Sequence, residues 1–191
     1  MRRLDLVVGC NGAGKSTFVQ YALSSIVPGS VFVNADVIAQ ERWPHDPVGH
    51  SYDAAKVAEQ TRAQLIKLGE SFIAETVFSH PSKISLIREA FAADYFVALH
   101  VLMIPEELAV ARVAQRVGDG GHHVPEHKIR GRYQRLWDNV ITAIELSDES
   151  ASSNFHGPRA AVARMHAGVG IDSPVWPRWA PKALTARWPA S

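Results

Sequence analysis

The sequence predicts an α/β fold with three layers, in which a mainly parallel five-stranded sheet is covered by helices on both faces. Short apolar runs of strand length alternate along the chain with longer stretches of helical periodicity. A glycine-rich turn joins the first strand to the first helix, as in nucleotide-binding α/β proteins. The chain has 191 residues, of which 47% are hydrophobic and 20% charged, so we expect one globular domain with a substantial core.

The first strand, Leu4 to Val8, runs into Gly-Cys-Asn-Gly-Ala-Gly-Lys-Ser-Thr at residues 9–17. This segment matches G-x-x-x-x-G-K-[ST] between a strand and a helix, which is the context of a phosphate-binding P-loop. Glycines let backbone N–H groups close around a polyphosphate, while Lys15 can reach the β- and γ-phosphates and the Ser16 hydroxyl can ligate Mg²⁺. We therefore predict that ATP or another nucleoside triphosphate is bound by Gly9, Asn11, Gly12, Ala13, Gly14, Lys15, Ser16 and Thr17.

Composition restricts the classes of function. A net charge of +1 does not favour a nucleic-acid partner, and no apolar stretch of the roughly 18 residues needed to span a membrane is present. Cys10 is the only cysteine, so the sequence excludes an intramolecular disulfide and suits a reducing, cytoplasmic compartment.

A helix follows the P-loop, with Phe18, Ala22 and Ile26 on its predicted buried face, and Pro28-Gly29 ends it. Residues 31–33 form the second strand, which ends in Asn34-Ala35-Asp36. Because ligands of parallel sheets lie beyond the carboxyl ends of the strands, Asp36 should project towards the γ-phosphate and could take a proton from an acceptor hydroxyl. The alternative is that Asp36 caps a helix over residues 37–41.

A proline-containing loop over residues 42–50 precedes a helix over residues 51–68, which Gly69 ends. Trp43 in the loop could stack on a substrate ring, although a loop anchor is the preferred interpretation. The predicted buried face of the helix is Ala54, Ala58, Thr61, Leu65 and Leu68.

The third strand, residues 71–74, delivers Glu75 and Thr76 to the same edge as Asp36. These side chains suit hydrogen bonds to a polar acceptor or to magnesium-bound water; the alternative is that Glu75 only ends the strand. We expect Ser79 to cap a helix over residues 80–93.

The most hydrophobic run, residues 95–103, predicts a central strand buried on both faces. Pro105 opens the next helix, and Arg112 and Arg116 share one face of it. A further helix begins at Pro125-Glu126, and its predicted buried face is Ile129, Tyr133, Leu136, Val140 and Ile144.

Residues 112–135 carry six Lys or Arg against two Asp or Glu and contain a glycine-rich turn. Such a segment suits a lid whose arginines neutralise charge on a transferring phosphoryl group, although a solvated basic face is the alternative. His122 and His123 in the turn have no cysteine or carboxylate at zinc-ligand spacing, so we do not predict a zinc site.

The composition changes after Asp148. Residues 161–165 and 169–171 around Gly168 predict a hairpin or edge strand, and Trp176, Trp179 and Trp188 alternate with prolines. Aromatic residues among arginines could stack on RNA, but a tail wrapped over the domain is preferred. We divide the chain into a nucleotide-binding unit with its lid, residues 1–150, and a tail packed on the same domain, residues 151–191.

Together these motifs resemble the zeta toxin family. The resemblance rests on the P-loop, Asn34-x-Asp36-x-Ile38, Glu75-Thr76-x-x-Ser79, and Gly120-Gly121-His122-x-Val124-Pro125 before Arg130-x-Arg132-Tyr133, and it extends from residue 4 to about residue 148. It implies a P-loop kinase fold and Mg²⁺-dependent phosphoryl transfer from ATP to a UDP-sugar such as UDP-N-acetylglucosamine. An antidote protein is a further partner that the resemblance implies.

By position, the resemblance makes Asp36 the acceptor-activating aspartate and Lys15 the phosphate lysine, with Arg116 as a third catalytic residue. Nucleotide phosphates would be clamped by Arg112, Arg116, Arg130 and Arg132. The acceptor would be bound by Asn34, Asp36, Glu75, Thr76 and His122. The alternatives are a kinase of another small hydroxylated metabolite or antibiotic, an RNA-end kinase, and a regulatory module that hydrolyses ATP slowly.

Overall fold

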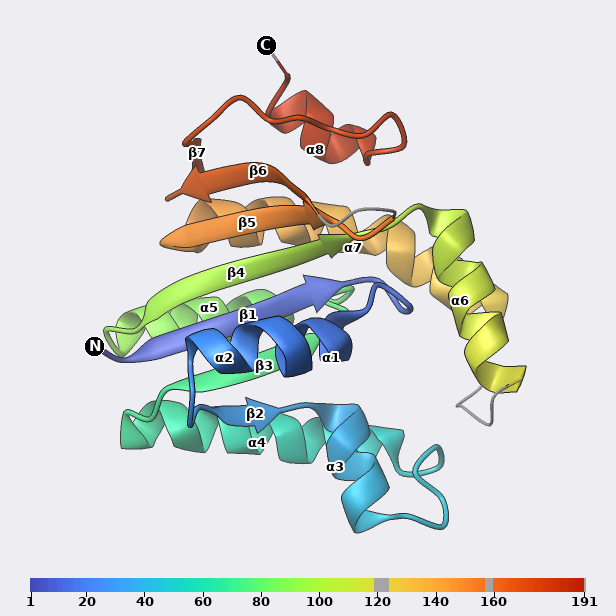
Figure 1. Ribbon diagram of the computed structural model, residues 1–191. Helices are drawn as coiled ribbons and strands as arrows, with labels where there is room; N and C mark the ends of the chain where they lie inside the picture. Colours follow the sequence, from blue (N-terminus) through green and yellow to red (C-terminus); the bar gives the residue numbers. More distant parts are fainter. Residues whose placement is uncertain (119–123, 157–159, 191) are drawn as a thin grey trace.

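The computed structural model describes residues 1–118, 124–156 and 160–190. Within these ranges one sheet has seven strands, in the order β2-β3-β1-β4-β5-β6-β7 (Figure 1). The strands are β1 (Arg3–Gly9), β2 (Val31–Val33), β3 (Phe72–Thr76), β4 (Phe96–Met103), β5 (Glu149–Asn154), β6 (Ala160–His166) and β7 (Val169–Gly170). The helices are α1 (Lys15–Phe18), η1 (Val19–Leu23), α2 (Ser24–Ile26), α3 (Ala35–Arg42), α4 (Ser51–Leu68), α5 (Lys83–Ala92), α6 (Glu106–Gly118), α7 (Glu126–Leu146) and α8 (Lys182–Arg187).

The α/β class and the mainly parallel sheet are confirmed, but the prediction of five strands is wrong. Strands β2, β3, β1, β4 and β5 are parallel, and β6 and β7 extend the sheet antiparallel. The sequence of β5 is Glu-Ser-Ala-Ser-Ser-Asn, which has no apolar pattern, so no sequence signal marked it as a strand.

Strand β1 is central and sets the register of the edge that carries the candidate site. Val7 pairs with Glu75 of β3 and His100 of β4, and Val8 pairs with Thr76. Because β1 and β3 are parallel and in this register, the glycine-rich loop after β1 lies beside Glu75 and Thr76.

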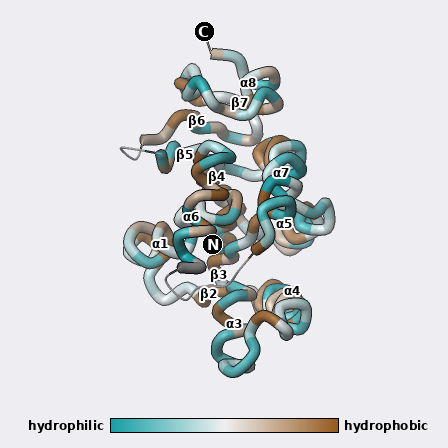
Figure 2. The backbone as a smooth tube through the Cα atoms, turned by 90° about the vertical axis from the view of Figure 1, so that its right-hand side faces the viewer, coloured by the Kyte–Doolittle hydropathy of each residue, from teal (hydrophilic) through white to brown (hydrophobic). Residues whose placement is uncertain are grey.

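Helices cover both faces of the sheet. Figure 2, which looks at the strands from the edge with the glycine-rich loop, shows α1 on one side of the strands and α4, α5 and α7 on the other. Helix α6 lies at the near edge, beyond the ends of the strands (Figures 1 and 2). This is the three-layer arrangement expected for a parallel sheet, whose strands must be covered on both faces.

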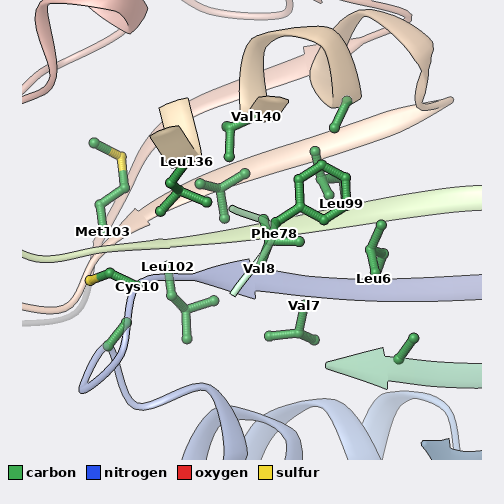
Figure 3. Packing of buried hydrophobic residues seen from close by; sticks show 14 of the residues in the cluster. Leu6, Val7, Val8, Cys10, Phe78, Leu99, Leu102, Met103, Leu136 and Val140 are labelled. Atoms are coloured by element: carbon green, nitrogen blue, oxygen red, sulfur yellow. The ribbon is translucent and has the colours of Figure 1, made fainter. Parts of the chain in front are cut away.

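The core lies in two layers, because alternate residues of a strand face opposite sides of the sheet. Figure 3 shows Leu6 and Val8 on the side of Leu136 and Val140 from α7, whereas Val7 lies on the opposite side, towards α1. All five of these side chains are fully buried. The predicted buried face of α7 is confirmed, since each of its five predicted residues is buried.

The helix after the glycine-rich loop packs on a different face from the one predicted. Its middle turn, η1, is a π-helix, and its buried residues are Val19 and Leu23, while Ile26 is exposed. Val19, Leu23 and the half-buried Val27 are spaced by four residues, so the buried face has the predicted spacing but starts one residue later.

Helix α4 has the predicted bounds, and Gly69 ends it in the left-handed conformation with φ of 73°. Its buried face includes Arg62, whereas Leu68, which was predicted to be buried, is exposed. Helix α5 begins at Lys83, so the prediction that Ser79 caps it is wrong; Ser82 precedes the helix and makes no side-chain cap.

The C-terminal segment contains the predicted hairpin. Ala167 and Gly168 turn β6 into β7 with φ of 47° and 75°. The Trp188 indole N–H donates to the Gly168 carbonyl at 2.9 Å, and the Trp176 indole N–H donates to the Trp188 carbonyl at 2.7 Å. Arg187 forms an ion pair with Glu145 of α7, so the end of the chain is fastened to the sheet and to α7.

Candidate active site

The glycine-rich loop has the backbone shape that a polyphosphate requires. A Cβ at Gly9 would lie 2.5 Å from the Leu102 carbonyl oxygen, so only glycine fits where the loop leaves β1. Gly14 precedes α1 with φ of 84°, in the left-handed region that favours glycine. The loop therefore turns the N–H groups at the start of the helix towards the open side of the sheet edge.

Four polar side chains meet beside the loop. The Ser16 hydroxyl donates to Glu75 Oε2 at 2.9 Å, and the Asn34 amide donates to the same oxygen at 2.7 Å. Lys15 Nζ donates to the Cys10 carbonyl at 3.2 Å and lies 3.9 Å from Glu75 Oε1. Glu75 thus reaches the phosphate-binding loop as well as the strand end that carries Asn34.

Asn34, not Asp36, caps α3. The Asn34 side-chain oxygen accepts hydrogen bonds from the N–H groups of Asp36 at 2.7 Å and Val37 at 3.2 Å. The alternative that Asp36 serves as the cap is therefore wrong. Within the described residues the Asp36 carboxylate has no hydrogen bond or ion pair, and it lines the candidate pocket.

These side chains open into a pocket of about 650 Å³. It is lined by Lys15, Ser16, Asn34, Asp36, Glu75, Thr76, and side chains from α4, α5, α6 and α7. Six Lys or Arg and two Asp or Glu line it, as far as the described residues show. In a chain whose net charge is only +1, this excess of positive charge is typical of a pocket for anionic ligands.

The predicted lid arginines have different placements. Arg112 donates to the Gly12 and Phe155 carbonyls, each at 3.2 Å, so its guanidinium braces the glycine-rich loop. Arg116 and Arg132 line the pocket, and neither has a hydrogen bond or ion pair in the part of the chain that the structure describes. Both guanidinium groups are available for phosphate oxygens.

Arg130 is not brought to the pocket. Its guanidinium binds Glu107 at 2.6 and 2.8 Å and Glu126 at 2.8 Å. These hydrogen bonds to carboxylates raise the pKa of Arg130 and lower that of Glu107. The guanidinium of Arg130 therefore joins the start of α6 to the start of α7, and we do not assign Arg130 to nucleotide binding.

Two other predicted residues have distinct outcomes. The Thr76 hydroxyl accepts a hydrogen bond from the Phe78 N–H at 3.3 Å, and both residues line the pocket. Phe78 has φ of 64° and a fully buried ring, so the turn after β3 is held in an unfavourable conformation by core packing. His122, in the predicted glycine-rich turn, lies outside the described residues.

Trp43, in the loop after α3, packs within that loop. It stacks on His50 with ring centroids 4.8 Å apart, which makes it an anchor within the loop.

Burial raises the pKa of the Cys10 thiol to about 11, so this thiol stays protonated and unreactive at neutral pH.

Sequence reasoning missed Arg62 and Lys83, which line the same pocket from α4 and α5. Arg62 is four residues after Ala58, which is on the predicted buried face of α4, so the helical period was the signal that could have identified it. Nothing in the local sequence of Lys83 distinguishes it from a surface lysine.

The described residues contain no group of three His, Cys, Asp or Glu placed to share a metal ion. The Ser16 hydroxyl and the Glu75 carboxylate nevertheless fit Mg²⁺, because this ion takes one or two protein oxygens and completes its shell with water and phosphate oxygens. None of the helices described is long and apolar enough to cross a membrane.

Comparison with known proteins adds the family and the fold. The sequence profile of the zeta toxin family matches residues 2–149. An uncharacterised protein of Haemophilus influenzae is 29% identical over 126 residues, which make up 65% of this chain and 88% of that protein.

Three solved structures share the fold at low identity. A chain of the AvrRxo1-ORF1:AvrRxo1-ORF2 complex with ATP has a TM-score of 0.70 and 16% identity over 89% of this chain and 60% of its own length. A chain of the PezAT toxin–antitoxin system of Streptococcus pneumoniae has a TM-score of 0.65 and 16% identity, over 98% of this chain and 84% of its own length. A gluconokinase from Sinorhizobium meliloti has a TM-score of 0.53 and 17% identity, over 83% of this chain and 86% of its own length. The fold is thus that of P-loop kinases, and the chain spans 60% of the length of the AvrRxo1 chain that it matches.

Proposed function

The chain belongs to the zeta toxin family, and on this premise we propose that it transfers the γ-phosphoryl group of ATP to a hydroxyl of a UDP-sugar such as UDP-N-acetylglucosamine. One observation carries the proposal: the Asp36 carboxylate lines the same pocket as the P-loop lysine, Arg116 and Arg132, and neither it nor the two guanidinium groups has a partner among the described residues. A base beside a phosphate site is the arrangement that phosphoryl transfer to an alcohol needs.

Each group has a role in this reaction. Asp36 orients the acceptor hydroxyl and receives its proton while the acceptor oxygen forms a bond to the γ-phosphorus. The bond from the γ-phosphorus to the bridging oxygen breaks, and ADP leaves. Lys15, Arg116 and Arg132, which line the same pocket, stabilise the charge that spreads over the transferring group and the leaving oxygen.

Glu75 and Ser16 are the pair that would hold Mg²⁺, which neutralises phosphate charge when bound. Asn34 supports this pair because its amide fixes Glu75 Oε2, while its carbonyl oxygen caps the helix that carries Asp36. Arg112 keeps the P-loop in place through the Gly12 carbonyl. Thr76 is the remaining strand-end hydroxyl available to an acceptor.

The family and two of the structural neighbours also motivate a partner. PezAT is a toxin–antitoxin system, and AvrRxo1-ORF1 was crystallised with AvrRxo1-ORF2. We therefore propose an antidote protein for this chain as well.

The test is mass spectrometry of the products formed from ATP, Mg²⁺ and a panel of UDP-sugars, gluconate and other hydroxylated metabolites. A gain of one phosphoryl group on a UDP-sugar is the expected result. Asp36→Asn should lower kcat by about 10²–10⁴-fold, because a general base is removed. It should leave ATP binding within about twofold, a change well below the tenfold that corresponds to 1.4 kcal/mol.

Lys15→Ala serves as the second variant and should lose both ATP binding and turnover, while Lys67→Ala on the outer face of α4 should behave as the unaltered protein. Phosphorylation of another panel member alone would discard the UDP-sugar as acceptor. Release of ADP at the same rate in Asp36→Asn, with no phosphorylated acceptor, would instead favour the slow regulatory ATPase.

A further inference from the structure

We infer that Arg62 and Lys83 form a second anion-binding site in the pocket, separate from the P-loop, and that it holds a phosphate of the acceptor. The inference deepens the proposed function and rests on it in one respect: it takes the second ligand of the pocket to be the acceptor. What it adds is the pair of residues that binds the acceptor's phosphate and so selects a phosphate-bearing acceptor over a neutral sugar or polyol.

Arg62 is an unusual component of a helix face. Its side chain is on the buried face of α4, only 8% exposed, and lines the pocket together with Ala55 and Ala58. Within the described residues its guanidinium has no hydrogen bond or ion pair. Burying a charged group without a partner is unfavourable. We therefore expect a bound ligand to supply the partner of this guanidinium.

Small residues leave the space that the guanidinium faces. Ala55 and Ala58 precede Arg62 by seven and four positions on the same helix. Long side chains of a helix extend towards its N-terminus, so Arg62 extends over the turn of Ala58. Helix α4 begins near the carboxyl ends of the strands and runs back along the sheet (Figure 1). The arginine therefore extends towards the end of α4 that adjoins the site.

Lys83 approaches the same space from another element. It is the first residue of α5 and is partly buried, and its ammonium group makes no hydrogen bond or ion pair among the residues described. Burial lowers the pKa of Lys83, and so does the positive charge of Arg62; burial likewise lowers the pKa of Arg62. Both cations line the same pocket, Arg62 buried and Lys83 partly buried, so water is partly excluded from both.

Neighbouring charges do not neutralise this pair. Glu59 and Glu89 raise the pKa of Arg62, and Glu59 acts in the same direction on Lys83, but among the described residues neither carboxylate forms an ion pair. His80, whose Nδ1 is 2.9 Å from the Ser82 hydroxyl, and Tyr52 of α4 are further titratable groups that line the pocket. An anion between Arg62 and Lys83 would remove their repulsion and supply the missing partner.

The two groups of cations serve different ligands. Lys15, Arg116 and Arg132 belong to the P-loop, α6 and α7, whereas Arg62 and Lys83 belong to α4 and α5. A nucleoside triphosphate on the P-loop uses the first group. The second group then has a phosphate of the acceptor as its counterpart, and the planar fork of Arg62 suits two phosphate oxygens at once.

The experiment measures binding without turnover. The P-loop is filled with Mg²⁺ and a non-hydrolysable ATP analogue, and calorimetry then gives the affinity of UDP, uridine or gluconate. UDP and uridine differ by the diphosphate alone. Arg62→Gln and Lys83→Gln should each weaken UDP by about tenfold or more, as expected for the loss of a charged hydrogen bond. Uridine should be unaffected.

Lys67→Gln removes an exposed cation from the same helix and should leave UDP binding unchanged. Arg62→Lys, which keeps the charge and loses the fork, should fall between Arg62 and Arg62→Gln; it also serves if Arg62→Gln does not fold. UDP affinity that is the same in all variants overturns the inference. The inference is also overturned if the affinity for gluconate depends on Arg62 and the affinity for UDP does not, because the second ligand is then a carboxylate.

Failure of this inference and failure of the proposed function give different results. A phosphorylated UDP-sugar whose KM is the same in Arg62→Gln leaves the kinase and removes the subsite. UDP binding that depends on Arg62 and Lys83, with no UDP-sugar phosphorylated, keeps the subsite and removes the UDP-sugar as acceptor.

Discussion

Single side chains connect the two halves of the candidate site. Asn34 uses its carbonyl oxygen to cap α3 and its amide to hold Glu75, so one residue positions both the Asp36 helix and the carboxylate beside Ser16. Sequence pattern placed Asn34 at the right strand end, but which side chain capped the helix depended on side-chain geometry.

Gly9 and Gly131 give opposite predictions for the same substitution. Gly9→Ala would place a Cβ 2.5 Å from the Leu102 carbonyl oxygen, so the P-loop must shift, and both stability and ATP affinity should fall. Gly131 lies inside α7, where a Cβ meets only the flexible end of Arg135 at 3.3 Å. Gly131→Ala should therefore stabilise the protein by about 0.5–1 kcal/mol. Denaturant unfolding with and without ATP measures both; equal effects of the two substitutions would contradict the explanation.

At the scale of elements, the helix that covers one face of the sheet carries much of the stability. Every predicted apolar position of α7 is buried, and Tyr133 also donates its hydroxyl to the Ile104 carbonyl at 3.1 Å. The same helix presents Arg132 to the pocket. Its packing therefore fixes the position of a residue that we assign to phosphate binding.

Leu136→Ala tests this packing. Leu136 is fully buried against the sheet, and its truncation should cost about 2–5 kcal/mol in the free energy of unfolding, because it loses buried apolar surface and leaves a cavity. Leu68→Ala is the matched control, since Leu68 is 63% exposed at the end of α4, and it should change stability by less than about 0.5 kcal/mol. Comparable losses from both substitutions in urea unfolding would refute the assigned burial.

At the scale of the whole molecule, a buried charge network links the two central strands. Asp5 of β1 is fully buried and accepts hydrogen bonds from Arg3 at 2.7 and 2.9 Å, and its Oδ1 lies 2.9 Å from Nε2 of His100 on β4. Burial acts to raise the pKa of Asp5, but the hydrogen bonds to His100 and Arg3 outweigh it, so the pKa is lowered.

The lowered pKa predicts a pH dependence of global stability. A carboxyl whose pKa is lower in the folded than in the unfolded chain stabilises the fold above its unfolded pKa of about 4, and this contribution is lost as the pH falls through the folded pKa. Asp5→Asn should thus be less stable than the natural chain at pH 7, and the difference should shrink below about pH 4. Asp138→Asn, which removes an exposed carboxylate of α7, should give a curve parallel to that of the natural chain. The measurement is urea unfolding between pH 3 and pH 7, and a constant difference for Asp5→Asn would contradict the prediction.

The sequence by itself determined the strand–loop–helix of the P-loop, the bounds of α4, the buried face of α7 and the strand ends that carry Asp36, Glu75 and Thr76. These features depend on local patterns: the glycines and lysine of one motif, a period of 3.6, and the rule that parallel strands end at one edge. The inner strand β5 was missed because a strand paired on both sides by backbone hydrogen bonds does not need an apolar pattern of its own.

Only the tertiary structure decided which charged side chains share the pocket. Arg116 and Arg130 were both predicted to bind the nucleotide, yet α6 presents the first to the pocket, and three glutamates form ion pairs with the second. Arg62 and Lys83 are 21 positions apart, on α4 and α5, and the packing of these helices brings both to the lining of one pocket. Charges act through space across elements that are distant in the chain, so their partners follow from how the helices pack and not from the order of the residues.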